Sequence, residues 1–422
     1  MTGIAAIHWL ALCAGVGALL AWLAFRRPSA LLGLVLATFA IGPQWVLAHS
    51  APPGLLAWAM PAHMLLLVLA LLANAARYGV RLDLVNWPLL AVLLLLCQSL
   101  LLADLDPAIT PAALLEATLG FALPWCLVHV ALRPGSRARY ALLIALLPTL
   151  CVIAGAVLDW LGIHPLFAGS AGRGARLQGA SNPGWLAFLA FAGFAIALHE
   201  AVRRRRFDFA SLAALNLGIA LMSGGRMGVI ACAILAATYV LLAPGLRARL
   251  ALLALIAVAG AGGVMALGPH APLNELAQGP GLLDPNGRDR LWRGNLDAFL
   301  ASPLFGRGLG AAEHGGYQDL PHNEYLRLLV DSGLLGAALY GTAVLLWAWR
   351  VLDLIRPRER PFAWAMFLAL GAYAFTDNVL IMPAGMIPFL YLAIMRTPSL
   401  RRARRRRRRA DRRFVAQPAS TA

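Results

Sequence analysis

The sequence predicts an all-α polytopic membrane protein. Hydrophobic residues make up 60% of the 422-residue chain and charged residues only 13%, well below the charged share of an ordinary soluble domain. Apolar runs close to the roughly 20 residues that a membrane-spanning helix requires recur along the whole chain. These runs are continuous rather than alternating, which favours helices over a membrane β-barrel.

The apolar runs predict about 12 transmembrane helices, or about 13 if the last run is split, at roughly 20 residues each. Asp377, Asn378 and Pro383 interrupt the last run, so this run forms either one tilted helix or two short ones. The runs lie near residues 4–25, 30–48, 54–76, 85–103, 110–132, 140–162, 183–199, 208–222, 227–243, 250–268, 325–349 and 361–395.

Arginine sets the predicted topology. All 36 basic residues are arginine, and most of them gather at every second connection between apolar runs, as at Arg203 to Arg206. Because positively charged connections stay on the cytoplasmic side, these connections are predicted to face inward. Strict alternation places the N-terminus outside and the C-terminus inside. This arrangement requires an odd number of helices and favours splitting the last run.

The predicted organisation has four parts. Residues 1–267 carry the first ten or so transmembrane helices, residues 268–323 form one long outward loop, and residues 324–396 return to the membrane. Residues 397–422 form an arginine-rich cytoplasmic tail, which we interpret as a topology anchor near anionic lipids rather than a nucleic-acid-binding segment. The outward loop contains an amphipathic stretch from Asp289 to Leu300, and long ordered loops are usually functional.

Eight arginines oppose the topology bias because they lie in outward connections or near the membrane. Such placement is costly and indicates an anionic partner, and the guanidinium fork suits phosphate oxygens. The alternative is pairing with the local acids Asp284, Asp289, Asp297 and Asp319. The eight are Arg173, Arg176, Arg226, Arg288, Arg290, Arg293, Arg307 and Arg327.

Arg226 lies in a tight turn, Ser223-Gly-Gly-Arg226, between two apolar runs. The glycines permit unusual backbone angles and the close approach of a ligand. The arginine would stand at the N-terminus of the following helix, where the helix dipole also favours an anion. The alternative is a solvated turn with a lone charge.

His322 lies where the long loop re-enters the membrane, in Pro321-His-Asn-Glu324. Histidine is the side chain best suited to exchange a proton near neutral pH. Asn323 and Glu324 would orient it or cap the next helix, and a purely capping cluster is the alternative. Asp377, near the outer end of its run, is expected to line the same cavity or to pair with a neighbour.

Asp104 and Asp106 form a paired-acid motif in another outward connection. Paired acids beside a membrane can hold a divalent metal for phosphate-linked substrates. The motif is short and frequent, and a polar turn before Pro107 is the favoured interpretation.

A series of short motifs lies along residues 176–378: Arg176-Leu-Gln-Gly-Ala-Ser-Asn182, Ser223-Gly-Gly-Arg226, Arg288-Asp-Arg-Leu-Trp292, Ser302-Pro-Leu-Phe-Gly-Arg-Gly-Leu-Gly310, His322-Asn-Glu-Tyr-Leu326, Asp331-Ser-Gly-Leu-Leu-Gly336 and Thr376-Asp-Asn378. Each motif alone is weak, and their order and shared outward placement make the combination fairly specific. Taken together, these motifs resemble the O-antigen ligase family, which also includes O-antigen polymerases and bacterial O-oligosaccharyltransferases.

The resemblance implies a GT-C-like fold in the bacterial inner membrane and an active site in the periplasm, so the long loop would be periplasmic. It implies inverting, metal-independent glycosyl transfer without a cofactor. The implied partners are an undecaprenyl-diphosphate-linked glycan as donor and lipid A–core as acceptor. His322 matches the family's essential histidine, and Arg288, with Arg290 beside it, matches the arginine of the long loop.

The remaining expected site residues bind substrate. Arg226 and Arg176 match the family's other outward arginines, and Asn323 and Asp377 belong to matching motifs. Arginines also suit this reaction on chemical grounds, because fixed guanidinium groups would stabilise the charge that grows on a diphosphate leaving group.

Four alternative functions are open. An O-antigen polymerase or a protein O-oligosaccharyltransferase would use the same chemistry on another acceptor. A transporter of lipid-linked glycans would need charged residues along a path, but the inner halves of the predicted helices carry almost none. A metal-dependent glycosyltransferase would use Asp104 and Asp106.

Overall fold

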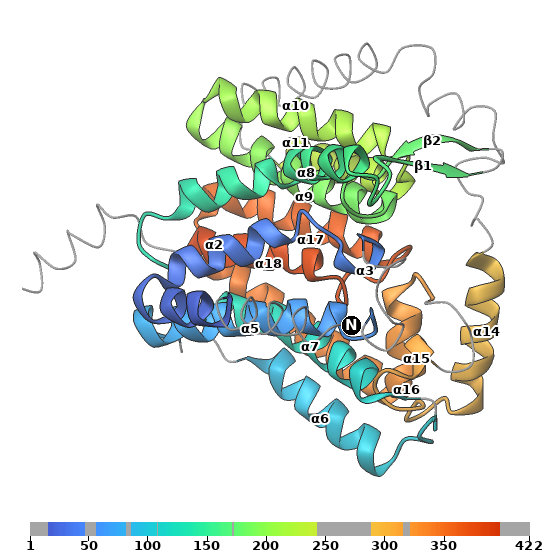
Figure 1. The fold of residues 1–422 in the computed structure, drawn as a ribbon. Helices are drawn as coiled ribbons and strands as arrows, with labels where there is room; N and C mark the ends of the chain where they lie inside the picture. The colour runs from blue at the N-terminus through green and yellow to red at the C-terminus, as the bar shows by residue number, and fades with distance from the viewer. Residues whose placement is uncertain are drawn as a thin grey trace, which may run out of the picture.

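The computed structural model of the chain describes residues 16–46, 56–81, 86–107, 109–170, 173–242, 288–314 and 321–396. Within these ranges the chain is a bundle of helices with one short β-hairpin (Figure 1). The predictions for the first part of run 4–25, the apolar run 250–268, the first part of the long loop and the arginine-rich tail lie outside the described residues.

The described elements follow the apolar runs in chain order. An apolar helix over Val16–Arg26 comes first. The elements after it are α2 (Pro28–Thr38), α3 (Pro43–Val46), α5 (Ala59–Tyr78), α6 (Trp87–Leu101), α7 (Pro111–His129), α8 (Arg137–Trp160), β1 (Phe167–Ser170), β2 (Arg173–Leu177), α9 (Pro183–Arg204), α10 (Phe207–Met222), α11 (Arg226–Leu242), α14 (Arg288–Ala301), α15 (Ala311–His314), α16 (Glu324–Leu354), η2 (Pro357–Glu359), α17 (Arg360–Ala374), η3 (Pro383–Met386) and α18 (Ile387–Arg396).

Five helices of the described part are long and apolar enough to cross a membrane, namely α5, α7, α8, α9 and α16. Several shorter apolar helices accompany them, including α6, α10 and α11. The chain is therefore a helical, multi-pass membrane protein. The number of spans and the GT-C-like architecture stay predictions.

Helix α9 forms the centre of the bundle, and every residue from Trp185 to Ala201 is buried. It packs against α8, α10 and α11. A side chain at Gly193 would lie 2.7 Å from the Asn216 side-chain nitrogen of α10 and 3.1 Å from Pro148 of α8, so the three helices meet closely there. Asn216 donates to the Ala145 carbonyl over 2.9 Å. Small residues and one interhelical hydrogen bond are typical of packing between membrane helices.

The structure differs from the sequence expectation near the N-terminus. The apolar run 30–48 does not form one span, because α2 ends at Thr38 and α3 restarts at Pro43. Gly42 and Pro43 interrupt the helix: proline cannot donate a backbone hydrogen bond, and the Gly42 amide donates to the Ala180 carbonyl instead.

A second correction concerns the all-α expectation. Strands β1 and β2 form an antiparallel hairpin within the outward connection after α8. This hairpin projects from the same end of the bundle as α14 (Figure 1).

The last apolar run splits into two helices. Helix α17 ends at Ala374, and the chain returns to helix only at η3 and α18. Residues 375–382 between them form an irregular turn, which we call the 375–382 turn. Asp377 and Asn378 lie in it, so the polar residues that interrupt the run mark the break between the helices.

Helix α16 is also interrupted, at Gly333, whose φ of 65° departs from helical geometry. The segment 303–308 runs alongside this break. The Arg307 amide donates to the Val330 carbonyl over 2.8 Å, and the Leu334 amide donates to the Pro303 carbonyl over 2.8 Å. Gln98 of α6 donates from its side-chain nitrogen to the carbonyls of Phe305 and Ser332, over 2.8 and 2.6 Å. Backbone groups freed inside a membrane protein are thus paired by the chain itself.

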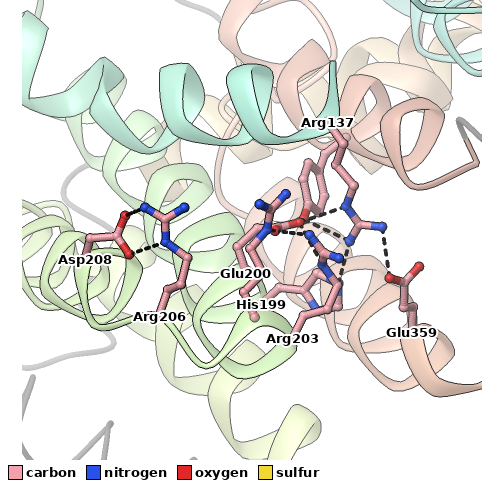
Figure 2. Close-up of polar contacts among 9 residues, drawn as sticks. Arg137, His199, Glu200, Arg203, Arg206, Asp208 and Glu359 are labelled. Carbon is pink, nitrogen blue, oxygen red and sulfur yellow. Dashed lines mark hydrogen bonds and ion pairs between the residues drawn. The ribbon is translucent and has the colours of Figure 1, made fainter. Parts of the chain in front are cut away.

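An ion-pair network joins α8, α9, η2 and α18 (Figure 2). Arg137, the first residue of α8, lies 2.8 Å from Glu200 of α9 and 2.9 Å from Glu359 of η2. Arg203 and Arg204 also bind the fully buried Glu200. Tyr391 of α18 donates to the same carboxylate over 2.8 Å. We call this cluster the Arg137 network.

Candidate active site

His322 is held in an unusual backbone conformation immediately before α16. Its φ is +46°, in the left-handed region that residues other than glycine seldom adopt. Asn323 caps α16, because its side-chain oxygen accepts from the Tyr325 and Leu326 amides over 3.1 and 3.0 Å. Strained residues of this kind cluster at functional sites, and here the cap fixes the direction in which His322 leaves the helix.

Three successive residues, 322 to 324, pair with the 375–382 turn. His322 Nδ1 lies 3.1 Å from Asp377 Oδ1. The Asn323 amide donates to the Asn378 side-chain oxygen over 3.2 Å. The Leu380 amide donates to Glu324 Oε2 over 3.1 Å. Three hydrogen bonds therefore join the start of α16 to the break between α17 and α18.

The His322–Asp377 contact has a direct chemical consequence. A carboxylate beside Nδ1 favours the neutral tautomer that carries its proton there, which leaves Nε2 free to accept a proton. The His322 side chain is 39% exposed and Asp377 is 17% exposed. The imidazole is thus accessible to a reactant, while the carboxylate that orients it is largely covered.

Helix α14 places Arg288 against the same turn. Arg288 donates from Nη1 to the Thr376 carbonyl, next to Asp377. Trp292, one turn later, donates to the Pro321 carbonyl over 2.8 Å, and its ring meets Phe375 edge-on at 5.7 Å. The structure therefore brings Arg288 beside the His322–Asp377 pair. Arg290 and Arg293 lie on the same helix and are exposed.

Arg176 and Arg226 meet at a second point, the turn between α10 and α11. Arg176 of β2 donates from Nε to the Ser223 carbonyl over 3.0 Å. A side chain at Gly224 would lie 2.8 Å from that nitrogen, and Gly224 has a φ of +59°. The glycine therefore makes room for Arg176 beside the turn, and Arg226 begins α11 two residues later.

The two arginine positions lie at the same end of the bundle as His322. Helix α11 packs against α17, and Tyr239 near the end of α11 meets Phe362 near the start of α17 at 5.7 Å. The two helices consequently run in opposite directions. Arg226 at the start of α11 thus lies at the end where α17 finishes and the 375–382 turn begins.

Arg307 and Arg327, which belong to the eight outward arginines, bind acids that the sequence did not suggest. Arg307 lies 3.1 Å from Asp106, and the buried Arg327 bonds Glu324 over 2.8 Å. Asp106 lies in a distant connection, whereas Glu324 is three residues before Arg327 on α16. For these two arginines, pairing with an acid of the chain replaces the expected anion site.

The paired-acid motif forms a turn that docks on the segment 303–308. Asp106 is buried and binds Arg307, and its amide donates to the Arg307 carbonyl over 3.2 Å. The Asp104 amide donates to the Gly306 carbonyl over 3.3 Å, and its side chain is exposed. Within the described ranges, no three His, Cys, Asp or Glu side chains gather as a metal site would require. The arrangement agrees with the polar-turn interpretation of the motif.

For some residues the sequence indicated the position but not the partner. Asn378 interrupts the last apolar run and belongs to a matching motif, and its side chain accepts the Asn323 amide. Glu324 was expected to orient His322 or to cap the helix, and it accepts the Leu380 amide, which links α16 to the 375–382 turn. Gln98 lies inside an apolar run, where a single amide among leucines was the one available clue.

One family profile matches part of the chain. The sequence profile described as O-antigen ligase matches residues 209–341, which include Arg226, Arg288 and His322 but neither Arg176 nor Asp377. A search of curated proteins finds no significant match. The matched residues and the order of the motifs point to the same family. Residues 209–341 are therefore similar to the O-antigen ligase family, and the profile does not cover the rest of the chain.

Proposed function

We propose that the chain is an O-antigen ligase that transfers a polysaccharide from undecaprenyl diphosphate to a hydroxyl group of lipid A–core. The reaction would take place at the periplasmic face of the bacterial inner membrane. The match of residues 209–341 to the O-antigen ligase profile supports an activity of the O-antigen ligase or polymerase type. The observation that carries the finer proposal is the accessible His322 imidazole, oriented by Asp377 and flanked by Arg288.

His322 acts as the general base in this proposal. Asp377 holds the proton on Nδ1, so Nε2 accepts the proton of the acceptor hydroxyl as that oxygen attacks. Asp377 also stabilises the imidazolium that forms. The turn that carries Asp377 belongs to a different element from His322, so docking of the 375–382 turn on α16 assembles the base.

The arginines act on the leaving group. As the bond between sugar C1 and the diphosphate oxygen breaks, negative charge grows on the diphosphate. Arg288 is already fixed next to the base and would stabilise this charge without the cost of reorganisation. Arg226 and Arg176 at the same end of the bundle would bind the diphosphate and so position the donor, and Arg290 would add charge at the exposed rim.

Glycosyl transfer in this proposal is a single nucleophilic displacement at sugar C1. The acceptor oxygen forms a bond to C1 from the face opposite to the leaving group, so the anomeric configuration inverts. The C1–O bond to diphosphate breaks, and its electron pair leaves with undecaprenyl diphosphate. The proton moves to His322 Nε2 and then to solvent or to the released diphosphate. Asn323 supports the geometry by capping α16 beside the base.

The proposal is tested by transfer with the purified full-length chain, a lipid-linked donor and lipid A–core, in the presence of a chelator. We expect a ladder of glycan-modified lipid A–core that does not depend on the chelator. Loss of all product with chelator and its return with a divalent cation would instead favour the metal-dependent alternative.

The acceptor is tested separately by deleting the gene and resolving lipopolysaccharide on a gel. A ligase predicts that every glycan-bearing band disappears from lipid A–core. Retention of a band with one repeat unit would indicate a polymerase, and transfer to a protein serine or threonine would indicate an oligosaccharyltransferase. Movement of the lipid-linked glycan without bond cleavage would indicate a transporter.

A further inference from the structure

A buried ion pair lies directly beneath the His322 site. Arg327 is fully buried on the first turns of α16. Its Nε donates to Glu324 Oε1 over 2.8 Å, and Nη2 binds the same oxygen. The guanidinium also lies over the Phe121 ring of α7, at 4.3 Å from the ring centroid. The side chain is thus fixed on several sides and has no exposed surface from which to contact a substrate.

The two oxygens of Glu324 have different partners. Oε1 accepts from Arg327, and Oε2 accepts from the Leu380 amide over 3.1 Å. Leu380 lies three residues after Asp377 in the 375–382 turn. Glu324 therefore links Arg327 to the 375–382 turn, which carries the carboxylate beside His322.

Helix α7 also contacts the 375–382 turn. A side chain at Gly120 would lie 2.9 Å from the Leu380 carbonyl oxygen. Phe121, the next residue of α7, is the ring that contacts Arg327. Helix α7 therefore contacts both the turn and the arginine that determines its position.

A charged pair at this depth calls for an explanation beyond packing. Burial of two charges costs several kcal/mol per ion before their attraction repays it, and an apolar pair of similar volume would often be as stable. Ionisable groups within membrane proteins therefore usually mark function. A charged arginine gives Glu324 a fixed carboxylate orientation, which an apolar neighbour could not provide.

We propose that Arg327 is a positioning residue for glycosyl transfer. By fixing Glu324, it sets the register of the 375–382 turn against α16 and so keeps Asp377 on His322 Nδ1. This inference rests on the proposed function, because it assigns Arg327 a role only through the His322–Asp377 pair. Arg327 itself does not touch donor or acceptor.

The test is a double-mutant cycle on the purified full-length chain, with kcat and donor KM measured per folded molecule. The variants are Arg327→Met, Arg327→Lys, Asp377→Asn and the double variant of Arg327→Met with Asp377→Asn. Since a misplacement of about 1 Å costs on the order of 100-fold in rate, we expect Arg327→Met to lower kcat by about that factor while the donor KM stays nearly constant. Arg327→Lys restores part of the loss because it keeps a charge for Glu324.

The double variant distinguishes positioning from general stability. If Arg327 acts through Asp377, the double variant is no slower than Asp377→Asn alone, because the effects of coupled residues do not add. Multiplied losses in the double variant, or wild-type kcat in Arg327→Met, overturn the proposal. Arg137→Met is the matched control. It removes another buried ion pair, in the Arg137 network, and we expect less folded protein but unchanged kcat per folded molecule (Figure 2).

A second variant keeps the test decisive if Arg327→Met does not fold. Glu324→Gln preserves volume but offers one acceptor oxygen where Arg327 and the Leu380 amide need two. The same loss of kcat is expected, again absent in the Asp377→Asn background. His322→Ala is run beside these variants. Full transfer by His322→Ala overturns both the proposed function and this inference, whereas its inactivity together with an unaffected Arg327→Met overturns this inference alone.

Discussion

His322 Nδ1 lies 3.1 Å from Asp377 Oδ1, although the two residues are 55 positions apart in the chain. One belongs to the start of α16 and the other to the break between α17 and α18. Two neighbouring hydrogen bonds, from Asn323 to Asn378 and from Leu380 to Glu324, hold the same two segments together. The docking of these two segments of the chain therefore determines the orientation of the histidine.

Asp377→Asn is expected to lower kcat much more than it raises the donor KM. The amide keeps the size of the side chain but can neither favour the productive tautomer nor stabilise the imidazolium. A loss of up to about 10⁴-fold accompanies the same change in serine proteases, and we expect a loss of at least about 100-fold here. The measurement is steady-state transfer by the purified enzyme.

The matched control for this change is Asp104→Asn. Asp104 is an exposed acid of the same end of the bundle, outside the proposed base. We expect its activity to equal that of the wild type. An inactive Asp104→Asn together with an active Asp377→Asn would reverse the two roles and favour the metal-dependent alternative.

Substitution of Arg288 is expected to lower kcat more than substitution of Arg290. Arg288 is fixed against the Thr376 carbonyl beside Asp377, whereas Arg290 is exposed on the same helix. Removing one fixed group that stabilises charge in the transition state costs on the order of 100- to 1,000-fold in kcat. We expect a loss of this size for Arg288→Ala and a smaller one for Arg290→Ala, measured under saturating donor. Equal losses, or a larger loss at Arg290, would contradict the assignment of Arg288.

Gln98→Leu is expected to destabilise the fold. The Gln98 side chain donates to the carbonyls of Phe305 and Ser332, and leucine would leave both without this donor. Each buried group left unpaired costs about 1–3 kcal/mol. Thermal unfolding in detergent should therefore begin at a clearly lower temperature. The control is Cys97→Ala, at the exposed neighbouring position, which should unfold at the same temperature as the wild type. A normal melting temperature for Gln98→Leu would show that the two carbonyls find other hydrogen-bond donors.

Gly333→Ala is expected to prevent the break in α16 from docking on segment 303–308. An added methyl group would lie 2.6 Å from the Gly306 amide nitrogen, and a φ of +65° is unfavourable for alanine. Folded yield after membrane extraction should fall sharply. Gly341→Ala, on the same helix, meets nothing within 4 Å and serves as the control. Normal yield for Gly333→Ala would mean that the close backbone approach is dispensable.

The sequence predicted the helical membrane fold because hydropathy acts locally and arginine marks the connections. It also identified the break in the last run, since Asp377 and Asn378 cannot lie in an uninterrupted apolar helix without cost. The run 30–48 was misjudged because Gly42-Pro43 was outweighed by the apolar residues on both sides. The hairpin of β1 and β2 lies in a glycine-rich segment that has no strand-like alternation to reveal it.

The site was only partly predictable for a different reason. Single residues such as His322 and Arg226 stand out because a polar or charged side chain next to the membrane is unusual. Pairings across the fold leave no such trace. The acid that binds Arg307 is Asp106, about 200 positions earlier in the chain, and no local pattern points to it. Arg327 instead binds Glu324, three residues before it on the same helix, a spacing that local sequence does contain.

The most direct test of the central assignment is transfer by His322→Ala, with membrane insertion and folded yield measured on the same preparation. We expect the variant to insert and fold like the wild type and to transfer no detectable glycan to lipid A–core. Transfer at the wild-type rate by the folded variant would contradict the role of His322 as the general base.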